Sequence, residues 1–231
     1  MPRDPGNAPP PAVACLAAFP RLGGEPPFAI ARCASPRHLR THAFRFASNL
    51  VPRESRQARR VEDVHRAVGS ARGGRAAAEQ LTHAYALLLS SQFQGFCRDL
   101  HSECVAHFVG AGSTAPAAPV IQAALVLARR LDRGTPNPGN IGADFNRLGI
   151  ELWPEIHRLD QRNAARQMRI AQLAEWRNAI AHDDFGREAL VPLRVQLATV
   201  RGWRRACDAL AGSFDRVMRR YLASIMGTSP W

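Results

Sequence analysis

Three side chains that lie close together in the sequence combine anion binding with proton transfer. They are Arg177, Asn178 and His182, at the end of a stretch with helical spacing. Arginine keeps its charge, so Arg177 can bind and stabilise an anion but cannot move a proton. Histidine is the side chain that ordinarily exchanges a proton near neutral pH, so His182 can act as a base or an acid. Together they suit chemistry at a phosphate.

The spacing of these residues limits the local structure. Positions five apart on an α-helix are separated by roughly 140°. On an unbroken helix, Arg177 and His182 are therefore not expected to face one phosphate. We expect the helix to stop near Ala181, so that His182 can swing on a loose last turn. Asn178 and His182 are four apart, share a face and could form a hydrogen bond.

A structural role for the same residues is the main alternative. Arg177 could pair with Glu175 or Asp184 on the surface, while His182 caps the end of its helix. Four polar residues lie close to the core stripe of the long helix predicted over 75–109: Ser90, Ser91, Gln92 and Gln94. They could line a groove beside the motif, or they could face solvent or satisfy a neighbouring helix end.

A second cluster has the residue types of a zinc site. Its members lie at positions i, i+4, i+7 and i+10 of one predicted helix: Cys97, His101, Cys104 and His107. One straight helix offers two neighbouring ligands to a tetrahedral ion and spreads the next two over ~15 Å of its axis. We therefore expect buried cysteines and satisfied or exposed histidines, and neither a metal nor a cofactor.

Hydrophobic periodicity predicts helices throughout residues 61–227 and no confident β-strand. The expected helices cover residues 61–68, 75–109, 120–131, two short segments within 141–159, 163–181 and 193–225. The longest carries a stripe of seven residues at helical spacing: Leu81, Tyr85, Leu88, Phe96, Leu100, Cys104 and Phe108. The last has the clearest seam: Val200, Trp203, Cys207, Leu210, Phe214, Val217 and Tyr221. An all-α bundle of four to five main helices follows.

Residues 1–60 differ in composition from the rest. Ten of the 17 prolines lie between Pro2 and Pro52, without a sustained helical or strand period. Residues 1–75 hold 13 Arg against 5 acidic residues, a net charge of +8 out of +12 for the whole chain. A poorly ordered Pro/Arg-rich tail is expected. Because most of the charge lies there, nucleic-acid binding has to be argued from a site in the bundle.

The remaining features predict a cytoplasmic, non-membrane protein. No apolar run approaches the ~18 residues needed to cross a bilayer. The five cysteines form an odd set without the spacing of a disulfide scaffold, which is typical of a reducing compartment.

The string from Trp176 to His182 resembles the signature of HEPN domains, in which an Arg is followed by a polar residue, three further residues and a His. Two further segments are similar to the RiboL-PSP type of HEPN domain, and the likeness covers about residues 73–226. They are Leu87–Phe96 on the long helix and the section from Asn137-Pro138-Gly139-Asn140-Ile141 to Phe145-Asn146-Arg147-Leu148-Gly149.

This resemblance implies a four-to-five-helix bundle and a metal-independent endoribonuclease. It implies catalytic Arg177 and His182, and an Asn178 that positions the scissile phosphate or orients the imidazole. HEPN nucleases dimerise so that two motifs face each other, which implies a homodimer with a composite cleft for single-stranded RNA. It also implies products with 2′,3′-cyclic phosphate and 5′-OH ends, and a toxin or anti-phage role beside a cognate antitoxin.

Two other functions stay open at this point. A catalytically silent HEPN bundle could act as an RNA-binding or protein-interaction module. Alternatively, the chain is an α-helical scaffold in which the six-residue pattern is a coincidence.

Overall fold

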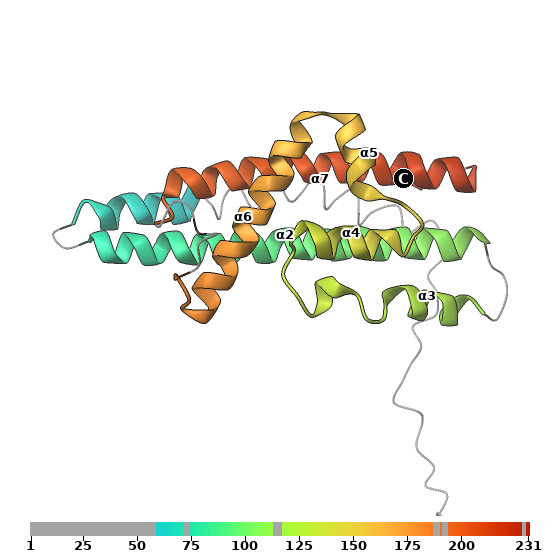
Figure 1. Ribbon diagram of the computed structural model, residues 1–231, viewed down its shortest axis with the longest axis horizontal. Helices are drawn as coiled ribbons and strands as arrows, with labels where there is room; N and C mark the ends of the chain where they lie inside the picture. The colour runs from blue at the N-terminus through green and yellow to red at the C-terminus, as the bar shows by residue number, and fades with distance from the viewer. Residues whose placement is uncertain (1–58, 72–73, 113–116, 187–189, 191–193, 228–229) are drawn as a thin grey trace, which may run out of the picture. The chain divides into compact units, whose positions relative to one another are not determined.

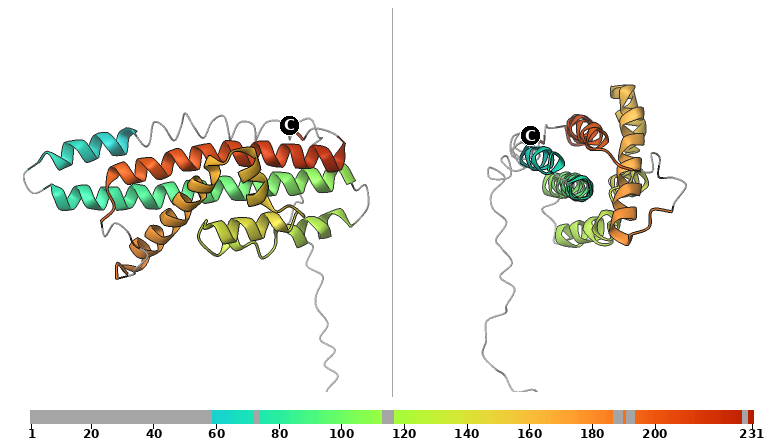
Figure 2. Two further views of the ribbon diagram at one scale, coloured as in Figure 1. Left: turned by 45° about the horizontal axis from the view of Figure 1, so that its top comes forward. Right: turned by 90° about the vertical axis from the view of Figure 1, so that its left-hand side faces the viewer.

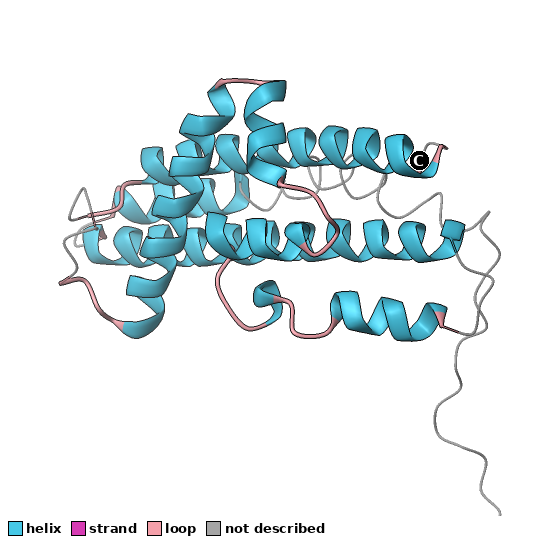
Figure 3. Cartoon of the chain, turned by 45° about the vertical axis from the view of Figure 1, so that its right-hand side comes forward, coloured by secondary structure: helices cyan, strands magenta, loops and turns pink. Residues whose placement is uncertain are grey.

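All secondary structure in the described part of the chain is helical. The structure is a computed structural model that describes residues 59–71, 74–112, 117–186, 190, 194–227 and 230–231. Within these ranges there is no strand, which confirms the predicted all-α class (Figure 3). A helix over 59–69 corresponds to the predicted segment 61–68. Residues 1–58 of the expected tail lie outside the described residues. None of the described helices combines the length and apolar character that a bilayer crossing requires.

Two long helices, α2 (Arg75–Gly112) and α7 (Leu197–Met226), run side by side in the same direction (Figure 1). Near their starts, Tyr85 of α2 accepts a hydrogen bond from Arg204 of α7. Farther along both helices, the rings of Phe93 and Phe214 lie 6.1 Å apart. The chain must therefore return between them, and it does so through a series of shorter helices.

The buried face of α7 is the one predicted from its spacing. Six of the seven predicted seam residues are buried, and Tyr221 is partly buried. On α2 the prediction is wrong at two positions, because Leu88 and Phe108 are 36% and 38% exposed. Leu88 points about 100° away from its buried neighbour Leu89. At the end of α2, Val105 and Val109 take the buried positions in place of Phe108.

The returning helices are α3 (Ala118–Val126), the 3-10 helix η2 (Arg130–Asp132), α4 (Pro138–Asn146), α5 (Leu152–Leu159) and α6 (Arg162–His182). The helix predicted over 120–131 therefore ends early. Ala128 adopts a left-handed backbone with φ 62°, which an α-helix cannot include, and Leu131 is buried as part of η2 instead. This break separates α3 from η2.

One aromatic cluster ties four helices together. The ring of Phe214 on α7 lies 6.1 Å from Phe93 on α2, 6.2 Å from Phe145 on α4 and 5.4 Å from Trp153 on α5. Such tilted and edge-on pairs each add about 0.5–1.5 kcal/mol beyond simple burial. Helix α6 crosses this frame obliquely and packs against both α7 and α2 (Figure 2). Its C-terminal end is thereby fixed beside α2.

Candidate functional site

An open polar hollow of about 440 Å³ lies where the end of α6 meets the η2–α4 loop and the middle of α2. Helix α6 supplies three lining residues: Arg177, Asn178 and His182. The end of η2, the loop after it and the start of α4 supply five: Asp132, Arg133, Gly134, Thr135 and Asn140. Helix α2 supplies Gln94. The three residues singled out from the sequence are therefore brought together.

The route by which they meet differs from the expected one. Helix α6 does not stop at Ala181 but includes His182, and it ends at Asp183, which is left-handed with φ 53°. Arg177 and His182 nevertheless line the same hollow because the long arginine side chain spans the angular gap. Its Nη1 donates to Asn178 Oδ1 at 3.2 Å, so the guanidinium turns toward the face that Asn178 shares with His182. The continuous helix therefore does not keep the two groups apart, contrary to the prediction from helix geometry.

The immediate contacts of the motif also differ from those considered above. The described contacts include neither an ion pair of Arg177 with Glu175 or Asp184 nor a hydrogen bond between Asn178 and His182. His182 is exposed at the C-terminal end of α6. Its imidazole is therefore accessible to a ligand that enters the hollow.

The wall formed by the η2–α4 loop is held by side-chain amides. Gln94 Nε2 donates to the carbonyl oxygens of Leu131 and Gly134, and Asn140 Nδ2 donates to Thr135 O at 2.9 Å. A Cβ at position 134 would lie 2.8 Å from Asn140 Nδ2 and 3.2 Å from the carbonyl oxygen of Arg130, which explains the glycine. Of the four polar residues noted on α2, only Gln94 lines the hollow.

A buried carboxylate anchors this wall from behind. Asp144 is only 1% exposed, and its two oxygens accept from the backbone N–H groups of Arg130 and Leu131 at 2.8 and 2.9 Å. These N–H groups open η2 and would otherwise lack a partner inside the helix. Asn137 caps the next helix by accepting from the N–H of Asn140 at 2.7 Å. Both ends of the loop are therefore fixed.

The charges around the hollow do not cancel. Its one lining carboxylate, Asp132, is paired with Arg98 at 2.8 Å and with buried Arg129 at 3.0 Å, and neither of these arginines lines the hollow. In the part of the chain that the structure describes, neither Arg133 nor Arg177 has an ion pair with a carboxylate. The hollow is consequently positive and suited to an anion.

The four residues with zinc-ligand types are not arranged as a metal site. Burial raises the pKa of the Cys97 and Cys104 thiols far above its ordinary value, so the thiolate form that binds zinc is disfavoured. His101 is buried with Nε2 3.1 Å from the carbonyl oxygen of Asp144, and burial lowers its pKa to about 4. Among the described residues, no group of three or more His, Cys, Asp or Glu could hold an ion.

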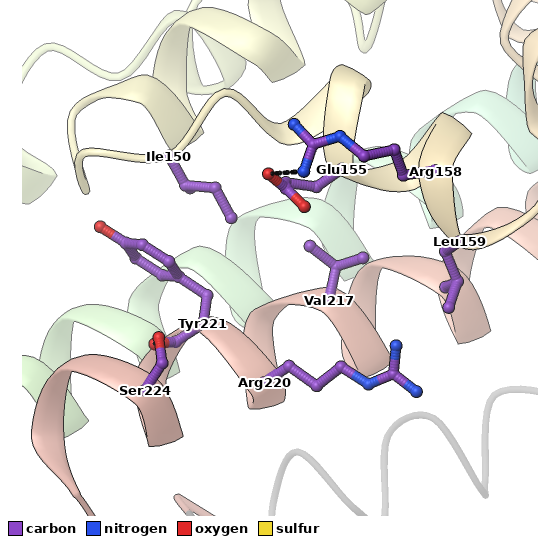
Figure 4. A pocket seen from close by; sticks show the side chains of 8 residues that line it. All are labelled: Ile150, Glu155, Arg158, Leu159, Val217, Arg220, Tyr221 and Ser224. Atoms are coloured by element: carbon purple, nitrogen blue, oxygen red, sulfur yellow. Dashed lines mark hydrogen bonds and ion pairs between the residues drawn. The ribbon is translucent and has the colours of Figure 1, made fainter.

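A second hollow, of about 410 Å³, lies between α5 and α7 (Figure 4). Its wall includes the ion pair of Glu155 with Arg158 and the apolar side chains of Ile150 and Val217. Its lining includes no histidine. The residues singled out from the sequence, Arg177, Asn178 and His182, all line the first hollow.

No family model, curated protein or solved structure matches the chain. Two guanidinium groups, an imidazole and three side-chain amides surround a space open to solvent. The guanidinium and amide groups can bind a phosphate and stabilise the charge that develops on it. The imidazole can give or take one proton.

Proposed function

We propose that this chain is a HEPN-type, metal-independent endoribonuclease in which Arg177 and His182 are catalytic and Asn178 positions the substrate. The observation that carries the proposal is the sharing of one open, positively charged hollow by all three side chains. Helix α6 and the bundle around it then serve to hold these groups. The type of reaction, RNA cleavage without a metal, is proposed from the resemblance of residues 176–182 to the HEPN signature.

The proposed reaction needs a base, a cation and an acid. The base takes the proton of the ribose 2′-OH, whose oxygen attacks the adjacent phosphorus. Arg177 stabilises the negative charge that accumulates on the phosphorane oxygens. The acid then gives a proton to the departing 5′-oxygen as its bond to phosphorus breaks. The products carry a 2′,3′-cyclic phosphate and a 5′-OH, and protons balance without a metal.

This scheme favours a homodimer. One hollow contains a single imidazole, whereas the reaction uses a base and an acid at the same time. A second copy of the chain would supply the other His182 and a second Arg177 to a composite cleft. The exposure of His182 at the end of α6 is compatible with such an arrangement. A toxin or anti-phage role, with a cognate antitoxin as partner, is part of the proposal through the resemblance.

The proposal is tested with purified protein and a single-stranded RNA in the presence of EDTA. We expect cleavage to products with 2′,3′-cyclic phosphate and 5′-OH ends, identified by mass spectrometry. A substrate with one 2′-deoxynucleotide at the cleaved position is the matched control and should resist cleavage at that bond only. RNA binding without any cleavage across varied sequences would instead indicate the catalytically silent binding module.

A further inference from the structure

The η2–α4 loop contributes a second cation to the hollow, in addition to Arg177 of α6. Arg133 lines the hollow, and among the described contacts its guanidinium has no hydrogen bond or ion pair, whereas its backbone N–H donates to Arg130 O at 3.2 Å. The neighbouring Asp132 is already paired with Arg98 and Arg129, so its charge does not offset that of Arg133. An arginine in this state is available for an anion from solvent.

The position of Arg133 is set in advance of any ligand. The two ends of its loop are held by the buried carboxylate of Asp144 and by the cap that Asn137 provides to α4. Gln94 binds the carbonyl of Gly134 at 2.9 Å, directly after Arg133. A backbone fixed in this way lowers the entropy that is lost when the side chain binds.

The arrangement of charges indicates an extended anion. Arg133 and Arg177 come from different walls of one hollow, and the amides of Gln94 and Asn140 also line it. Two like charges that line one hollow repel each other in the absence of an anion, and a ligand that carries more than one negative group can pair with both. A nucleic-acid strand presents successive phosphates, and an arginine fork can bind each of them with two hydrogen bonds.

We propose that Arg133 binds a phosphate of the RNA strand next to the one held at Arg177 and His182. This inference rests on the proposed function for the identity of the strand. It makes the η2–α4 loop a substrate-binding wall, and Arg133 a residue that governs affinity rather than the chemical step.

The test compares Arg133→Gln with Arg130→Gln. Arg130 is exposed and lies three residues earlier, but its side chain does not line the hollow, so it is a matched charge control. Binding is measured by fluorescence anisotropy with a short 2′-O-methyl RNA, which cannot form the cyclic phosphate. We expect Arg133→Gln to weaken binding about 10-fold and to reduce the slope of log K against log salt by about 0.7, the value for one phosphate contact on a single strand. Arg130→Gln should change affinity less than about 2-fold.

Cleavage kinetics separate this inference from the proposed function. With cleavable RNA, Arg133→Gln should raise KM about 10-fold and leave kcat within about 2-fold. Equal affinity and KM for the two variants, in an active enzyme, would overturn the role of Arg133 and leave the nuclease intact. An inactive wild-type protein that still loses RNA affinity in Arg133→Gln would overturn the nuclease and leave the binding wall. Unchanged thermal unfolding of both variants verifies that the fold is retained.

Discussion

Replacing His182 with alanine is expected to lower the rate of RNA cleavage at least about 100-fold, because a positioned general acid or base contributes roughly 10²–10⁴-fold. The side chain is exposed and lies at the C-terminal end of α6, so its removal leaves no cavity in the core. Single-turnover cleavage in EDTA gives the rate of the chemical step. In a homodimer the variant loses both imidazoles at once, which places the expected loss toward the upper part of this range.

The matched control is His65→Ala, which removes a histidine from the helix over residues 59–69, away from the hollow. This variant should cleave RNA like the wild type. Sedimentation should show that both variants keep the oligomeric state of the wild type. If His182→Ala cleaved RNA as fast as His65→Ala does, His182 would be excluded as the proton-transfer group.

The largest expected effect on stability comes from Asp144→Ala. Its carboxylate is buried and accepts hydrogen bonds from two backbone N–H groups at the start of η2. Hydrogen bonds to a charged group contribute about 1.5–3 kcal/mol, and buried donors without a partner add their own desolvation cost. We expect a loss of about 3 kcal/mol in the free energy of unfolding, measured as a lower urea midpoint with an unchanged m-value.

Two further variants show whether this loss reflects the two hydrogen bonds. Asp144→Asn has a side chain of nearly the same size and keeps one acceptor oxygen. It should lower the free energy of unfolding by about half as much as Asp144→Ala. Asp63→Ala removes an exposed carboxylate that pairs with Arg66 at the surface, and it should cost less than about 1 kcal/mol. A stability of Asp144→Ala equal to that of Asp63→Ala would show that Asp144 does not anchor the wall.

The long helices could be predicted because their residues bury one continuous face. On α7, the alternation of three and four residues follows directly from 3.6 residues per turn, and the buried seam agrees with it. The break near Ala128 could not be predicted in this way. The 3-10 helix that follows the break is held at its start by Asp144, which accepts from the N–H of Arg130, 14 residues earlier in the chain, and helical periodicity contains no information on such a contact.

The candidate site was predicted in its residues but not in its geometry. Arg177, Asn178 and His182 lie around one hollow, although α6 continues through His182. Cβ directions on a helix do not determine where a long guanidinium ends, and this is where the angular argument failed. Arg133 was not predicted because its place in the hollow follows from tertiary contacts of the η2–α4 loop. The Gly134 and Pro136 that follow it indicated a loop without indicating which helix the loop faces.

The central claim, that RNA phosphate binds in the hollow beside Arg177 and His182, is tested most directly by ¹⁵N-histidine NMR. The eight histidines are labelled, and the His182 signal is assigned by its absence in His182→Ala. On titration with a short 2′-O-methyl RNA, we predict that the His182 signal shifts and saturates with the affinity found by anisotropy. The His65 signal should stay in place, and Arg177→Ala should weaken the response of His182. An RNA that binds with the same affinity while the His182 signal does not move would contradict the account.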